Sequence, residues 1–211
     1  SGPGHGEASY QTGQPHPEAS MSQLQVPATY VARRNFFNFL GITCRILDKA
    51  GGLLFFVKMK AFKLREDITL FKDAARTQPM ISIKARQIMD FSACYDVVDV
   101  GTGERVGACR RKGFKSILKD EWELLDADDA LVGHAKEDSM LLALIRRFLS
   151  NLVPQTFIVE AMGEKIGSLK GTWNPFLVKY AVDFSRNQGQ LDPRLGLAIT
   201  VLLLTIEGKQ K

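Results

Sequence analysis

The residues best placed to do chemistry in this chain are lysines and arginines, because they gather in two short stretches. Positions 105–119 hold six cations and neither Asp nor Glu: Arg105, Arg110, Arg111, Lys112, Lys115 and Lys119. A second group consists of Lys58, Lys60, Lys63 and Arg65. Clustered cations attract phosphate-bearing partners, which include lipid headgroups and nucleic acid. The competing interpretation is a solvated charged face without a ligand.

Residue types that support other chemistry occur without the partners they need. Cys44, Cys94 and Cys109 are widely spaced and form no CxxC pair, so they predict buried reduced thiols and neither a disulfide nor a zinc site. Two of the three histidines lie in the first twenty residues, which leaves His134 alone. We therefore predict no catalytic residue, no cofactor and no metal ion, and we expect a binding protein and not an enzyme.

Two loop-like segments have the composition of ligand sites but not their spacing. The segment GTGERVG at 101–107 lacks the spacing of a phosphate-binding loop and is followed by a strand-like run, so it predicts a hairpin turn. The acidic segment at 126–138 lacks the ligand order of a calcium-binding loop. Its paired residues Asp128 and Asp129 are typical of a turn.

The elements that must position the cations are mostly β-strands. From Gly41 onward, short β-type runs separated by turn residues recur about every ten residues, a pattern typical of an all-β sandwich or barrel. Lys58 and Lys60 alternate with apolar neighbours, which predicts that both cations project from the same outward face of a strand.

Three of the predicted hairpins share an internal signature. An acidic residue ends the first strand and a Val-Gly or Ile-Gly pair lies in the second: Asp99 with 106–107, Asp126 with 132–133 and Glu160 with 166–167. The small glycine permits a bend or a close backbone approach, and repeated bends help a sheet to close. The repeat therefore predicts a fold feature and carries no catalytic meaning.

Two segments predict helices. Residues 137–151 place Leu141, Leu144, Ile145 and Phe148 at helical spacing, as expected for an amphipathic helix on the barrel surface. In 191–208, Asp192 is placed to cap a helix whose residues 195–206 carry no charge. That run is too short to span a membrane comfortably, and a helix apolar on all sides must be enclosed by protein. We expect it to thread the barrel.

Composition divides the chain into a tail and one domain. Residues 1–24 are rich in Gly, Pro, Ser and Gln and predict either a disordered tail or a non-native remnant that precedes a start at Met21, whereas 25–211 predict a single domain. No signal for secretion or lipid modification is apparent, so the default expectation is a cytoplasmic protein, either free or peripheral to a membrane.

The order of these segments resembles the Tubby-like barrel superfamily, and within it the LURP-one-related and phospholipid scramblase branch. The resemblance is carried by residues 34–37, 46–73, 95–113, 122–133, 159–171 and 191–208. It implies a closed barrel of twelve strands around a central C-terminal helix. Tubby domains bind phosphatidylinositol bisphosphate through basic surface residues, and scramblases are associated with calcium-stimulated lipid movement and a palmitoylated cysteine cluster, which this chain lacks.

Residues and resemblance together predict a non-enzymatic module that binds anionic phospholipid headgroups or another phosphorylated ligand at an anionic membrane surface, without a transmembrane segment. The predicted site residues are Lys58, Lys60, Arg105, Arg110, Arg111, Lys112 and Lys115. The alternatives are lipid transport by scrambling and nucleic-acid binding. Against scrambling stands the absence of a segment long enough to span. Against nucleic acid stands the lack of aromatic residues interleaved with the basic ones.

Overall fold

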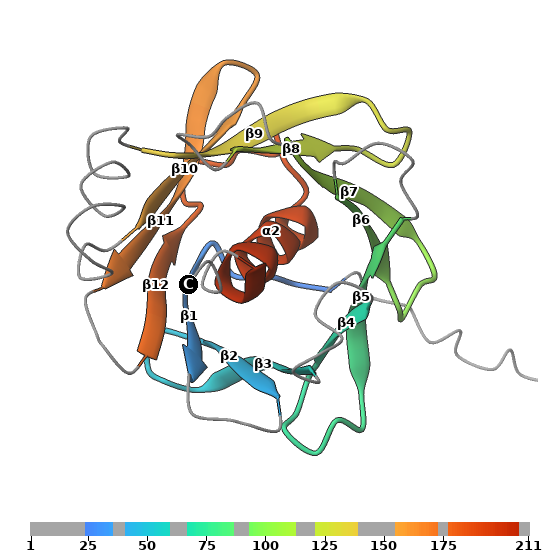
Figure 1. The fold of residues 1–211 in the computed structure, drawn as a ribbon, viewed down its shortest axis with the longest axis vertical. Coiled ribbons are helices and arrows are strands. Elements are labelled where there is room, and N and C mark those ends of the chain that lie inside the picture. Colours follow the sequence, from blue (N-terminus) through green and yellow to red (C-terminus); the bar gives the residue numbers. More distant parts are fainter. Residues whose placement is uncertain are drawn as a thin grey trace, which may run out of the picture.

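A computed structural model describes residues 24–35, 41–59, 67–86, 93–112, 121–138, 155–172 and 177–206. In these ranges the chain forms a closed antiparallel barrel of twelve strands with one helix inside it (Figure 1), which confirms the predicted fold. The elements are β1 (Thr29–Asn35), β2 (Ile42–Leu47), β3 (Leu53–Met59), β4 (Asp67–Phe71), β5 (Pro79–Ala85), β6 (Cys94–Asp99), β7 (Arg105–Arg111), β8 (Glu121–Leu125), β9 (Leu131–Glu137), β10 (Thr156–Ala161), β11 (Glu164–Thr172), β12 (Leu177–Asp183) and α2 (Pro193–Ile206).

Each strand pairs with its neighbours in the chain, and β12 closes the barrel by pairing with β1. Successive connections therefore alternate between the two ends of the barrel. The turns at 48–52, 72–78, 100–104, 126–130 and 162–163 lie at one end, which we call the turn end. The connections at the opposite end fall largely outside the described residues.

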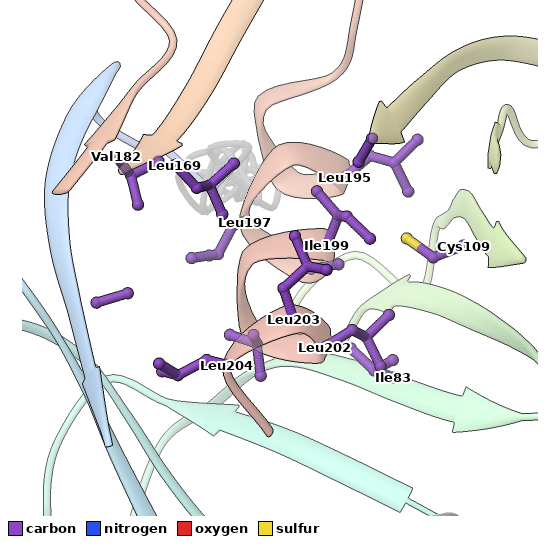
Figure 2. Close-up of a cluster of buried hydrophobic side chains, with 14 of the residues drawn as sticks. Ile83, Cys109, Leu169, Val182, Leu195, Leu197, Ile199, Leu202, Leu203 and Leu204 are labelled. Carbon is purple, nitrogen blue, oxygen red and sulfur yellow. The ribbon is translucent and has the colours of Figure 1, made fainter. Parts of the chain in front are cut away.

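The core is built from inward-facing strand residues and from α2. Alternation along each strand directs every second side chain inward. The helix presents aliphatic side chains toward the surrounding strands, among them Leu195 toward one side and Leu204 toward another (Figure 2). Twelve of its fourteen residues are buried. The prediction that this apolar helix fills a barrel is confirmed.

The start of α2 is fixed at the turn end by charge. The Asp192 carboxylate accepts a hydrogen bond from the Arg194 backbone N–H at 2.8 Å, which caps the helix as predicted. The Arg194 side chain is buried, and its guanidinium lies 3.0 Å from Asp99, 2.7 Å from Glu104 and 2.7 Å from Asp192. This cluster ties the helix to the β6–β7 hairpin.

The other end of α2 is held by a buried cation. Arg34, near the end of β1, donates hydrogen bonds to the carbonyl oxygens of Leu204 at 3.1 Å and Thr205 at 3.2 Å. These carbonyls lack partners within a helix, and a positive charge at a helix C-terminus is favourable. Midway along, the hydroxyls of Tyr30 and Thr200 form a hydrogen bond of 3.0 Å.

The three glycines of the hairpin signature allow close approach, as predicted. Gly107, Gly133 and Gly167 pair with the residues that directly precede the bulges in β6, β8 and β10. A Cβ atom on Gly107 or Gly133 would collide with a backbone carbonyl of the next hairpin, and one on Gly167 would collide with the Phe184 ring. The repeated glycine therefore sets the packing of one hairpin against the next.

Replacing Gly133 by Ala should lower the free energy of unfolding by about 2 kcal/mol, because strands β9 and β10 must separate locally. The added Cβ would lie 2.5 Å from the carbonyl oxygen of Glu160. Gly101→Ala is the control, since its nearest neighbour would be 3.4 Å away, and it should change stability by less than about 0.5 kcal/mol. Equal urea midpoints for the two variants would contradict this role.

Several other predictions concern segments of which the structure describes only a part. The predicted surface helix over 137–151 begins at Glu137, which is the last residue of β9, and its remainder from 139 onward lies outside the described residues. Most of the predicted tail over 1–24 also lies outside them, although Leu24 packs against the core. His134 lies in strand β9, and the three cysteines are buried and unpaired, both as predicted.

Candidate functional site

The described residues of the predicted basic site lie on separate parts of the barrel. Five of its seven residues are described: Lys58, Arg105, Arg110, Arg111 and Lys112; Lys60 and Lys115 lie outside the described residues. Strands β4, β5 and β6 separate Lys58 on β3 from the cations on β7. Arg105 begins β7 at the turn end, whereas Arg110 lies toward the opposite end and Lys112 follows the last residue of the strand.

Arg105 belongs to a cluster of two cations and two anions. The guanidinium nitrogens of Arg86 and Arg105 lie 2.6–2.9 Å from the carboxylates of Asp96 and Asp129. Hydrogen bonds from Arg86, and to a smaller extent from Arg105, lower the pKa of Asp129 to about 2. The same two arginines also lower the pKa of Asp96. The positive charge of Arg105 is therefore matched within the protein.

Arg110 and Lys112 are matched in the same way by the next strand. Arg110 lies 2.6 Å from Glu123, and Lys112 lies 3.0 Å from Glu121 and 3.6 Å from Glu123. The ion pair with Glu121 raises the pKa of Lys112. Burial opposes ionisation of Glu123, but Arg110 and Lys112 outweigh it and lower its pKa.

Arg111 faces the other side of β7. It lies opposite the fully buried Trp122 of β8 and is itself half-buried. The ligand-binding role of Arg105, Arg110, Arg111 and Lys112 stays a prediction, but three of these cations have anionic partners in the protein.

A different set of cations gathers on the outer face of β12, β1 and β2. Lys179 lies directly opposite Arg33 in the β12–β1 pair, and Arg33 lies directly opposite Arg45 in the β1–β2 pair. We call Lys179, Arg33 and Arg45 the basic row. Like charges directly opposite each other on neighbouring strands are destabilising, so this arrangement costs the protein stability.

Among the described residues, no carboxylate forms an ion pair with any member of the basic row. The Arg45 guanidinium lies 5.6 Å from the centre of the Phe56 ring, which orients its side chain without neutralising it. The Nε atom of Arg33 is buried and has no hydrogen-bond partner among the described residues. A buried donor without a partner is unfavourable, and an added acceptor would satisfy it.

Two exposed lysines extend the row. Lys58 projects outward from β3, and Lys170 projects outward from β11, so each of five adjacent strands carries at least one cation on its outer face. Strand β11 carries a second one, Lys165, near the turn end. The acidic residues in these five strands are Glu164 and Asp183, and both lie at the turn end. We call the outer face that bears Lys170, the basic row and Lys58 the basic wall.

Comparison with known families matches residues 53–201 to the LURP-one-related family. This chain belongs to the LURP-one-related family. The match runs from the start of β3 into α2 and covers most of the chain, and the closed barrel agrees with the Tubby-like resemblance. Searches of curated proteins and of solved structures found no match.

Within this LURP-one-related barrel, the basic wall combines residues inside and outside the family match. Lys58, Lys170 and Lys179 lie within the matched residues, whereas Arg33 and Arg45 precede them. The family assignment therefore describes the barrel and gives no role to the basic row.

The sequence offered only a weak signal for the basic row. Arg33, Arg45 and Lys179 are far apart in the chain and do not form one charge cluster. Each occupies an outward position of an apolar strand, which alternation can indicate. Their side-by-side placement depends on the pairing of the first and last strands, which no local pattern specifies.

Among the described residues, no helix is both long enough and apolar enough to cross a membrane. Helix α2 is fourteen residues long and is enclosed by the strands (Figure 1).

Proposed function

We propose that this LURP-one-related barrel is a non-enzymatic binding module for anionic phospholipid headgroups and that it binds them on the basic wall. The observation that supports the proposal is the basic row, in which Arg33 lies between two further cations. No carboxylate of the described residues forms an ion pair with the row.

A phosphate group fits this environment chemically. Arginine presents planar donors that match phosphate oxygens, and charge-assisted hydrogen bonds are stronger than neutral ones. A bound phosphate would relieve the repulsion within the row and would accept charge-assisted hydrogen bonds from its guanidinium and ammonium groups. Each cation near an anionic membrane contributes about 1 kcal/mol, so five together are sufficient for recruitment.

The alternative functions receive less support. Scrambling needs a polar path for headgroups across the bilayer, and the interior of this barrel is filled by the apolar helix α2. Nucleic-acid binding would use the same cations and is distinguished by competition. We also propose that the protein lies at the periphery of the cytoplasmic face of a membrane, where anionic lipids are concentrated.

The triple variant Arg33→Gln/Arg45→Gln/Lys179→Gln should bind anionic vesicles on the order of tenfold to a hundredfold more weakly than the unmodified protein. Sedimentation with phosphatidylcholine vesicles, with and without phosphatidylserine, measures this at two salt concentrations. We expect binding only to the anionic vesicles and weaker binding at the higher salt, because exposed charges are screened.

The matched control removes three exposed cations from the turn end: Lys49→Gln/Lys165→Gln/Arg186→Gln. It has the same net charge as the triple variant and should retain most of the binding. Equal loss in both variants would show that total charge matters and the basic wall does not. Displacement of the protein from vesicles by a short oligonucleotide at equal phosphate concentration would favour nucleic acid as the ligand.

A further inference from the structure

We infer that the barrel docks side-on against a flat anionic membrane, with Arg33 at the centre of the contact. This inference rests on the proposed function and adds the orientation of the protein. Helix α2 runs from Asp99 at the turn end to Arg34 at the opposite end. In side-on docking this helix lies along the membrane surface and does not point into it.

The positions of the cations around the barrel support a contact through its wall. Twelve strands place neighbours about 30° apart around the circumference. With β1 facing the membrane, β12 and β2 are tilted only slightly away, so all three members of the basic row reach the surface. Lys170 and Lys58 each lie one strand further from β1 around the barrel. Their distance from the membrane surface is then comparable with the Debye length, which is about 8 Å at physiological salt.

The other surfaces are less suited to an anionic membrane. The turns 100–104 and 126–130 contain no Lys or Arg. Their residues Glu104 and Asp129 are ion-paired, whereas Asp126 and Asp128 form no ion pair with a described residue and leave the region negative. On the far side of the barrel, Arg105 and Arg110 of β7 and the following Lys112 are paired with carboxylates. An anionic surface would be repelled by the first region and would have to compete with internal partners at the second.

The basic wall also lacks the side chains needed for insertion into the hydrocarbon. The large apolar side chains that are exposed among the described residues are Leu53, Val100, Leu131 and Met162. All four lie in or beside the turns of the turn end. The contact through the wall is therefore electrostatic, and it should be fully reversed by salt.

Three labelled variants test the orientation. The native cysteines are 0–4 % exposed, so a thiol-reactive fluorophore will label an introduced cysteine selectively. Ala181→Cys places the label on the basic wall, because Ala181 is exposed between Lys170 and Val31 on neighbouring strands. Lys112→Cys reports on the opposite end and the far side, and Met162→Cys reports on the turn end.

The probe is a phosphatidylserine-containing vesicle that carries a headgroup-linked quencher. We expect at least twofold quenching of the label at position 181 and little change at positions 112 and 162. If the 181 label instead blocks sedimentation with vesicles while the other two labels do not, the wall is again identified as the contact.

Stronger quenching at position 112 or 162 than at 181 would overturn side-on docking. Retained sedimentation in that case would leave the lipid-binding function standing with a different orientation. An unlabelled protein that fails to sediment with anionic vesicles would overturn the proposed function itself, so the two failures are distinguishable.

Discussion

Truncation of the chain after Leu191 will abolish folding and will not produce a smaller, stable barrel. The helix that this removes supplies the centre of the core, where its large aliphatic side chains are almost fully buried: Leu195, Leu197, Ile199, Val201, Leu202, Leu203 and Leu204. Burying one such side chain contributes about 1.5–3 kcal/mol, so the set contributes roughly 10–20 kcal/mol. The net stability of a domain is only about 5–15 kcal/mol.

Circular dichroism and the response to urea measure this outcome. The truncated chain should aggregate or lack a cooperative unfolding transition. The control is a chain that ends at Ile206, which keeps every described contact of α2 and should unfold cooperatively. A soluble truncation at Leu191 with a sharp transition would mean that the strands can close without the helix.

The fold was predictable because its signals are local. The uncharged run at 195–206 is too short for a membrane and too apolar for a surface, which leaves enclosure as the remaining option. The role of the glycine in each hairpin signature could also be predicted from the local sequence, because Gly107 and Gly133 occupy positions where a side chain does not fit. The start of helix α2 followed from Asp192 and Pro193 for the same reason.

The candidate site was not predictable in the same way, because charge compensation acts between strands. The acid-free window that suggested a basic patch ends at Lys119, and Glu121 and Glu123 follow within four residues. The β7–β8 hairpin folds these two carboxylates back onto Arg110 and Lys112. Counting charges along the chain therefore overstates the free charge of a strand whose partner is acidic.

The reverse error hides the basic row. A single Arg in an apolar strand such as β2 gives no sign of a cluster, because its neighbours come from β1 and β12. Only the closure of the barrel brings Lys179 beside Arg33. Within one strand, moreover, adjacent arginines face opposite sides, so Arg33 and Arg34 have different surroundings despite being neighbours in sequence.

That contrast predicts opposite phenotypes for two neighbouring substitutions. Arg34→Met should lower the free energy of unfolding by about 3 kcal/mol, because two carbonyl oxygens at the end of α2 lose a charged donor. Burial lowers the pKa of Arg34, but its guanidinium remains protonated at neutral pH. The loss corresponds to a melting temperature lower by about 6–12 °C, while vesicle binding by the folded protein should be unchanged.

Arg33→Met should have the reverse effect. Its guanidinium is paired with no described carboxylate and is opposed by two cations, so removing it should change stability by less than about 0.5 kcal/mol or raise it slightly. Binding to anionic vesicles should fall several-fold, because the centre of the basic row is lost. Melting curves and sedimentation on both variants separate the two roles. A large loss of stability in Arg33→Met with intact binding would assign Arg33 to the barrel structure and remove it from the ligand site.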